Sequence, residues 1–214
     1  MNTIWVGSLI AALLLSFSIF LVGGFTIRGR MKSPVTWRRL ALLTIPISLG
    51  ITVLLLWTGS DAVYAIRMSM LSAFLPLVAE IDRRELIIPN RLLLQMLAYW
   101  GLVMGMYMLR LKAFDLTVLT DSLLGGLIGA SPLLVRLVSK GGIGMGDIKL
   151  FALVGLYVGK EDVLRAMFLS LVIALFVMLG RKLRKQLEKK QEISFGPYVA
   201  IGTMLMLIMN IPLL

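Results

Sequence analysis

The sequence contains no cysteine and no histidine. The lack of cysteine excludes a disulfide, a thiol nucleophile and a cysteine-based zinc site. The lack of histidine removes the commonest metal ligand and the usual general base of enzymes. Any chemistry must therefore use carboxylates, hydroxyls, lysine, arginine or backbone groups, and we expect no metal and no cofactor.

Long apolar runs dominate the rest of the chain. The 214 residues are 59% hydrophobic and the mean hydropathy is +0.94, whereas soluble domains are about half apolar. Several runs approach the roughly 20 residues that cross a bilayer core. The sequence predicts an all-α, polytopic transmembrane helical bundle, with residues 1–214 forming a single membrane-embedded domain. We expect about eight spans, of which the sixth is short: 4–24, 40–57, 62–81, 92–109, 116–138, 147–159, 163–180 and 195–213.

The charge pattern gives an orientation. The net charge is +11, but the basic residues lie between apolar runs and are not interleaved with aromatic residues, which argues against nucleic-acid binding. Most of them fall in alternate loops, at 25–39, 82–91, 136–149 and 181–194. The positive-inside rule places these loops in the cytoplasm, where they would contact anionic lipid.

Two aspartates stand where this orientation puts the cytoplasmic ends of spans. Asp82 ends the third predicted span and Asp147 begins the sixth. These spans run in opposite directions, so both carboxyl groups lie at one membrane level. Two aspartates that share a proton can hydrolyse a peptide bond, because one takes a proton from water and the other donates to the carbonyl. The simpler interpretation is a headgroup-level charge at Asp82 and a helix cap at Asp147.

Glycines surround the second aspartate. Gly144 and Gly146 flank Met145 directly before Asp147. We expect unusual backbone dihedral angles there and close approach of a substrate. The dipole of the helix that begins here favours a negative charge, which predicts Asp147 as the ionised member of the pair.

Three further residues are candidates for shaping the site. Lys149 follows Asp147 by two positions, and could contact an acidic group of the substrate or tune the aspartates; alternatively it anchors the span at the interface. Pro89 and Asn90 precede the fourth predicted span. Proline there breaks the chain and would position the loop that follows Asp82.

These motifs together resemble the type IV prepilin peptidases, which are intramembrane aspartyl proteases of the GxGD type. The motifs are D-x6-P-N at 82–90, G-x-G-D-x-K at 144–149 and FGPYVAIG at 195–202. The resemblance implies an endopeptidase that cuts the short basic leader from type IV prepilins or pseudopilins at the cytoplasmic face of the bacterial inner membrane. Asp82 and Asp147 match the family's catalytic pair.

The loop between the first two spans departs from the family pattern. Many bacterial members carry a large cytoplasmic domain there, with paired CxxC motifs, and methylate the new N-terminus. This sequence has a short loop at 24–39 and no cysteine. We therefore expect N-methyltransferase activity to be absent or much reduced.

Other functions remain compatible with the sequence. One is a related GxGD protease with other membrane substrates, such as archaeal preflagellins. Another is an ion- or proton-coupled transporter that uses Asp82 and Asp147 as a relay, and a third is an inactive scaffold of a pilus or secretion assembly. The Pro-Asn pair and the paired glycines favour the peptidase, because a relay has no evident need for them.

A second pair of charges lies at the outer side. Arg67 is about five residues into the third predicted span and Asp121 about five residues into the fifth, both counted from the outer side. Charges within a membrane tend to pair. We hypothesise an Arg67–Asp121 ion pair; the alternative is two separate interfacial residues.

Overall fold

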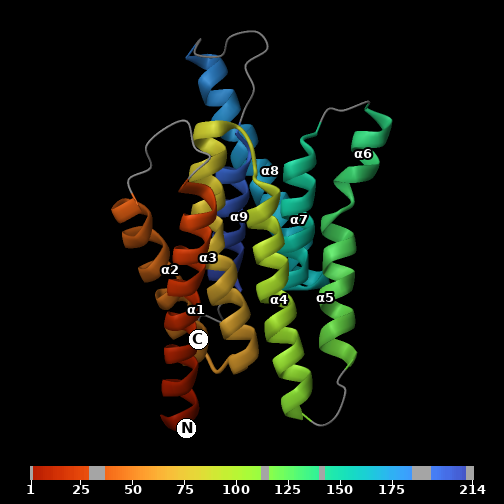
Figure 1. The fold of residues 1–214 in the computed structure, drawn as a ribbon. Coiled ribbons are helices and arrows are strands. Elements are labelled where there is room, and N and C mark those ends of the chain that lie inside the picture. Colours follow the sequence, from red (N-terminus) through yellow and green to blue (C-terminus); the bar gives the residue numbers. More distant parts are fainter. Residues whose placement is uncertain (1, 29–36, 112–115, 140–142, 185–193, 211–214) are drawn as a thin grey trace.

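The protein is a bundle of antiparallel helices (Figure 1). The computed structural model describes residues 2–28, 37–111, 116–139, 143–184 and 194–210. Within these ranges the chain forms helices and no strand. The helices are α1 (Asn2–Arg28), α2 (Trp37–Trp57), α3 (Ala62–Glu85), α4 (Asn90–Leu111), α5 (Leu116–Gly129), α6 (Pro132–Val138), α7 (Met145–Val158), α8 (Lys160–Leu183) and α9 (Gly196–Met209).

The predicted polytopic helical bundle is confirmed. Six segments are long and apolar enough to cross a membrane, at 6–24, 40–57, 62–85, 90–109, 116–138 and 160–183. The two other predicted spans, 147–159 and 195–213, correspond to α7 and α9, each of 14 residues. The predicted span 116–138 is not one regular helix, since a turn at Ala130 and Ser131 separates α5 from α6, which starts at Pro132.

The central helix of the bundle is α3. It packs against α1, α2, α4, α7 and α9, and most of its side chains are buried. An N-cap starts it, in which the Asp61 carboxylate accepts a hydrogen bond of 3.0 Å from the Val63 backbone N–H. The outer helices instead expose large apolar side chains, such as Leu109, Phe168 and Leu175, as expected for surfaces that face lipid.

Helices α5 and α7 touch backbone to backbone. Gly125 and Gly129 lie one turn apart on α5, and Gly155 faces them from α7. A methyl group added at Gly155 would overlap the backbone of Gly125, and one added at Gly129 would overlap the backbone of Phe151. Small residues at this spacing let two membrane helices approach closely. The contact fixes the position of α7, which carries Asp147 near its start.

The two candidate aspartates lie at one end of the bundle, where three helix termini meet. The C-terminal end of α3 and the N-terminal ends of α7 and α9 meet at the top of the bundle in Figure 1. The start of α3 lies toward the opposite end, and the turn from α7 to α8 lies between these two levels because α7 is short (Figure 1). The basic loops 25–39 and 181–194, which the sequence places in the cytoplasm, lie largely outside the described residues.

We predict that Gly155→Ala destabilises the protein, because its methyl group would force α5 and α7 apart. Overpacking of this kind costs about 2 kcal/mol or more of unfolding free energy. Thermal unfolding in detergent measures the change. The control is Gly101→Ala on α4, where an added methyl group meets nothing within 4 Å. Equal stability of the two variants would contradict the close α5–α7 contact.

Candidate active site

Asp82 is a buried carboxylate held by the start of α9. It lies in the last turn of α3 and is 4% exposed. Its Oδ2 atom accepts hydrogen bonds from the Gly196 backbone N–H at 2.7 Å and from the Ser194 hydroxyl at 2.8 Å. The Gly196 N–H belongs to the first turn of a helix and has no partner within that helix. These two donors fix the orientation of the Asp82 carboxyl group at the start of α9.

Position 196 has room only for glycine, because Asp82 packs directly against it. A Cβ atom there would lie 3.0 Å from both the Cβ and the Oδ2 atoms of Asp82. Next to it, the Phe195 ring packs edge to face against Phe151 of α7, with centroids 5.9 Å apart. The FGPYVAIG motif therefore joins the end of α3 to the middle of α7. Sequence reasoning missed Ser194 and Gly196 as site residues, although the motif already pointed to Gly196.

Asp147 lies in the first turn of α7, half-buried. It is close enough to Asp82 for the charge of Asp82 to act on it, so the structure brings the two predicted aspartates together. No described residue donates a hydrogen bond to the Asp147 carboxyl. The sequence predicted Asp147 as the ionised partner, and this stays a prediction; the hydrogen bonds from Ser194 and Gly196 go to Asp82.

The expectation of unusual dihedral angles at Gly144 and Gly146 is wrong. Gly144 is extended, with φ −62° and ψ 135°, and Gly146 lies within α7. Both glycines provide space instead. A Cβ atom at Gly144 would lie 2.7 Å from the Asp147 Oδ2 atom, and one at Gly146 would lie 3.2 Å from the Ile88 Cβ atom. The first glycine makes room for the carboxyl group, and the second lets α7 approach the loop after α3.

The Pro-Asn pair, at the end of the loop between α3 and α4, contacts Lys149 of α7. The Lys149 ammonium donates a hydrogen bond of 2.9 Å to the Asn90 Oδ1 atom. The Pro89 carbonyl accepts from the Leu92 N–H at 3.0 Å and so begins α4. Just before, α3 ends at Leu86 in a left-handed conformation, with φ 54°. Such a conformation is strained for leucine, and it turns the chain back toward α7.

No carboxylate cluster suitable for a metal ion occurs within the described residues. Two more acids, Glu80 and Glu85, lie near Asp82 on α3. Glu80 pairs with Arg83 at 2.9 Å and with Arg84 at 2.5 Å. Glu80 is thereby engaged with its own helix. The arrangement at the top of the bundle is a two-carboxylate site.

The hypothesis of an Arg67–Asp121 ion pair at the outer end is wrong. The described ion pairs join Glu80 to Arg83, Glu80 to Arg84 and Arg165 to Asp162. Arg67 donates instead to Ser122 and to backbone carbonyls of α7, and the Asp121 carboxylate accepts from the Lys160 N–H. Each of the two charged groups hydrogen-bonds to backbone groups at the end of a helix, and the two do not form an ion pair with each other.

Comparison with known proteins agrees with this geometry. The sequence model of the type IV leader peptidase family matches residues 69–179, which is more than half of the chain and includes both aspartates. The chain belongs to the type IV leader peptidase family. No solved structure matches it.

Curated relatives in this family are named prepilin leader peptidase/N-methyltransferase. The protein of Bacillus subtilis is 32% identical over 138 residues, which are 62% of this chain and 51% of the relative. That of Xanthomonas campestris pv. campestris is 30% identical over 152 residues, 68% of this chain and 48% of the relative. That of Pectobacterium carotovorum is 28% identical over 163 residues, 73% and 55% of the two chains. The chain thus spans about half the length of the curated relatives it matches.

We predict that Gly144→Ala inactivates the site without unfolding the protein. Alanine adopts the dihedral angles of Gly144 freely, so the main effect of the new methyl group is to displace the Asp147 carboxyl. A misplacement of about 1 Å costs on the order of 100-fold in rate. Turnover of a leader-peptide substrate and the melting temperature are measured together. Gly105→Ala, with nothing within 4 Å of its added methyl, is the matched control; full activity in Gly144→Ala would show that the carboxyl needs no such space.

We predict that Ser194→Ala slows turnover about tenfold, the effect of losing one hydrogen bond to a charged group. The loss follows because the Asp82 carboxyl group is no longer held by this hydroxyl. The control is Ser131→Ala, since the Ser131 side chain makes no capping hydrogen bond at α6. Full activity in Ser194→Ala would mean that this hydrogen bond does not position Asp82.

Proposed function

We propose that this protein is a membrane aspartic endopeptidase that cuts the short basic leader from type IV prepilins or pseudopilins. The observation that carries the proposal is the pair Asp82 and Asp147, held at one end of the bundle by three separate motifs. Asp82 is tied to the start of α9, and Asp147 stands at the start of α7, within electrostatic range of Asp82. Family membership supports the same reading.

The mechanism uses the two carboxyl groups in different states. The ionised Asp82 takes a proton from a water molecule, and the water oxygen attacks the scissile carbonyl carbon. The protonated Asp147 donates its proton to the carbonyl oxygen, which gives a neutral tetrahedral intermediate. When the C–N bond breaks, the proton held by Asp82 passes to the leaving amine, and Asp147 recovers its proton from the collapsing intermediate.

The site faces the cytoplasmic side of the inner membrane in this proposal. The loops at that end of the bundle carry most of the basic residues of the chain, which supports cytoplasmic placement by the positive-inside rule. A substrate would present its leader in the cytoplasm and keep its apolar helix in the lipid. The scissile bond then arrives at the level of the helix ends that carry the aspartates.

A proton relay explains less of the geometry. A relay requires carboxyl groups within the membrane, but it requires neither the Lys149–Asn90 link nor the space beside Asp147 at Gly144. The match to a peptidase family also favours hydrolysis. An inactive scaffold would have no need of either aspartate.

We predict that Asp82→Asn and Asp147→Asn each abolish cleavage of a prepilin by the purified protein in lipid, with a chelator present throughout. Asparagine keeps the shape and removes the acid, and loss of a general acid or base costs about 10²- to 10⁴-fold in rate. Asp162→Asn is the control, an acid at the start of α8 that pairs with Arg165. A variant that retains near-full rate would contradict the mechanism, and a wild type that never cuts would contradict the function.

The proposal is limited to the peptidase reaction. The relatives' names also include N-methyltransferase, but the chain covers about half of their length and has no cysteine. Incubation of this protein and its cleaved product with labelled S-adenosylmethionine tests for methyl transfer. We expect little or no label in the product.

A further inference from the structure

Arg67 is buried at the end of the bundle opposite to the aspartates. It lies near the start of α3 and is 5% exposed. Its Nη2 atom donates to the Ser122 hydroxyl of α5 at 2.9 Å, to the Leu156 carbonyl at 3.2 Å and to the Tyr157 carbonyl. One guanidinium group therefore joins α3, α5 and α7.

The two carbonyls are the last acceptors of a helix. Leu156 and Tyr157 lie in the final turn of α7, which ends at Val158. Such carbonyls lack partners within their own helix, and the negative end of the helix dipole attracts a cation. Arg67 provides both the hydrogen bonds and the charge.

Two further side chains, Trp100 and Tyr157, also hold the C-terminal end of α7. The Trp100 indole N–H of α4 donates to the Leu156 carbonyl at 2.9 Å, and the Tyr157 hydroxyl donates to the Met96 carbonyl of α4 at 2.8 Å. Beyond the helix, Gly159 turns the chain with φ 92°. The Asp121 carboxylate then accepts from the Lys160 N–H at 3.3 Å, at the start of α8.

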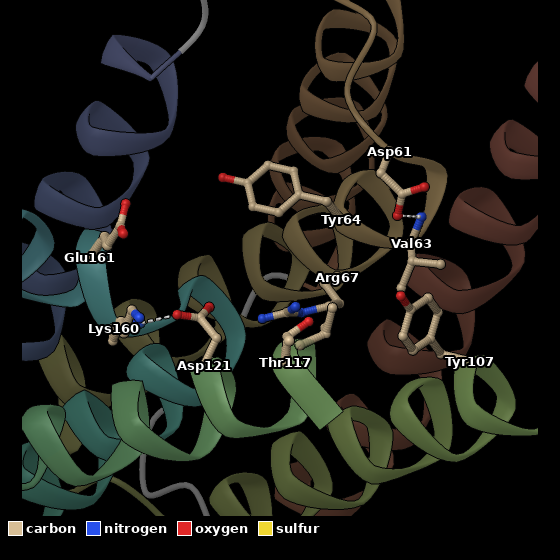
Figure 2. A pocket seen from close by; sticks show the side chains of 10 residues that line it. Asp61, Val63, Tyr64, Arg67, Tyr107, Thr117, Asp121, Lys160 and Glu161 are labelled. Carbon is tan, nitrogen blue, oxygen red and sulfur yellow. Dashed lines mark hydrogen bonds between the residues drawn. The ribbon is translucent and has the colours of Figure 1, made fainter. Parts of the chain in front are cut away.

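The charges around Arg67 also line a cavity of about 490 Å³ (Figure 2). The figure shows the guanidinium directed toward Asp121, with Lys160 beyond it. Asp121 and Asp61 each accept from the first turn of a helix, α8 and α3 respectively. The carboxylates of Asp61 and Asp121 are thus engaged by helix starts.

We infer that Arg67 is a positioning residue for the two aspartates. The helix that carries Arg67 carries Asp82 at its other end, roughly 22 Å away at 1.5 Å per residue. The helix that Arg67 holds carries Asp147, roughly 14 Å from Leu156 by the same rise. A shift of α7 along α3 would move Asp147 past Asp82. By holding the end of α7 to α3, Arg67 sets the relative height of the two carboxyl groups.

Disulfide formation at the opposite end measures this relative position. A Cβ atom at Gly146 would lie 3.2 Å from the Ile88 Cβ atom, near the separation of roughly 3.5–4.5 Å found in disulfides. The pair Ile88→Cys and Gly146→Cys joins the loop after α3 to the start of α7. The chain has no other cysteine, so the rate of oxidation in lipid, followed by mass-tagging of free thiols, reports on this pair alone.

We predict that Arg67→Met slows this cross-link about tenfold, as expected for loss of hydrogen bonds to a charged group, while Arg67→Lys gives an intermediate rate. Lysine keeps the charge but lacks the planar fork of arginine. The control is Arg165→Met, an exposed arginine at the same end that pairs with Asp162. Arg67→Met cross-linking at the wild-type rate would overturn the inference; if that variant does not fold, a wild-type rate in Arg67→Lys would do so.

The effect on catalysis rests on the proposed function. Without the cysteines, Arg67→Lys lowers kcat and leaves KM within about twofold, since it disturbs alignment rather than substrate binding. A change confined to KM would count against positioning. The cross-link needs no substrate, so it decides the role of Arg67 even if the wild-type protein cleaves no prepilin.

Discussion

The structure depends on one constraint: in lipid, a polar group must find its partner within the protein. Asp82 shows the consequence most directly. Its carboxylate is almost fully buried, and the Gly196 N–H and Ser194 hydroxyl that stabilise it come from a segment more than a hundred residues later in the chain. The start of α9 and the end of α3 therefore have to meet, and this contact determines how the last helix packs.

At both ends of the bundle, helix termini supply the hydrogen-bond partners of charged side chains. Helix termini offer unpaired N–H groups at their starts and unpaired carbonyls at their ends. The first N–H of α9 serves Asp82, the first N–H of α8 serves Asp121, and the last carbonyls of α7 serve Arg67. Each of these three charges is matched to a helix terminus of the opposite partial charge. The charged residues and the ends of the helices stabilise one another, so salt bridges between them are not required.

The sequence predicted the helical bundle from local patterns, although within the described residues six of the eight expected spans are long and apolar enough to cross a membrane. Apolar runs give the spans, and motifs before and after Asp82 and Asp147 give the candidate site. The hydrogen-bond partners were harder to predict, because they depend on which helices become neighbours. Ser194 was missed for this reason. The Arg67–Asp121 pair was wrongly expected because matching depth says nothing about the backbone groups that compete for each charge.

The two glycines before Asp147 were correctly singled out from the sequence, but for the wrong physical reason. Their presence before Asp147 was informative, but the expected reason was backbone freedom. Gly144 and Gly146 instead provide space, for a carboxyl group and for a neighbouring loop. The sequence gives the residue type, but only the packed structure shows which atoms lie close to the position that a Cβ atom would take.

The length of α7 connects these observations to the chemistry. Its 14 residues cover about 21 Å, less than the roughly 30 Å of a hydrocarbon core, so α7 alone is too short to cross that core. The buried end is covered by Arg67 and Trp100, and the other end holds Asp147 beside Asp82. A longer helix would lift Asp147 away from the end of α3. In the proposed function, the scissile peptide bond lies next to an apolar substrate helix at the membrane boundary, and a short α7 would keep the second carboxyl group at that level.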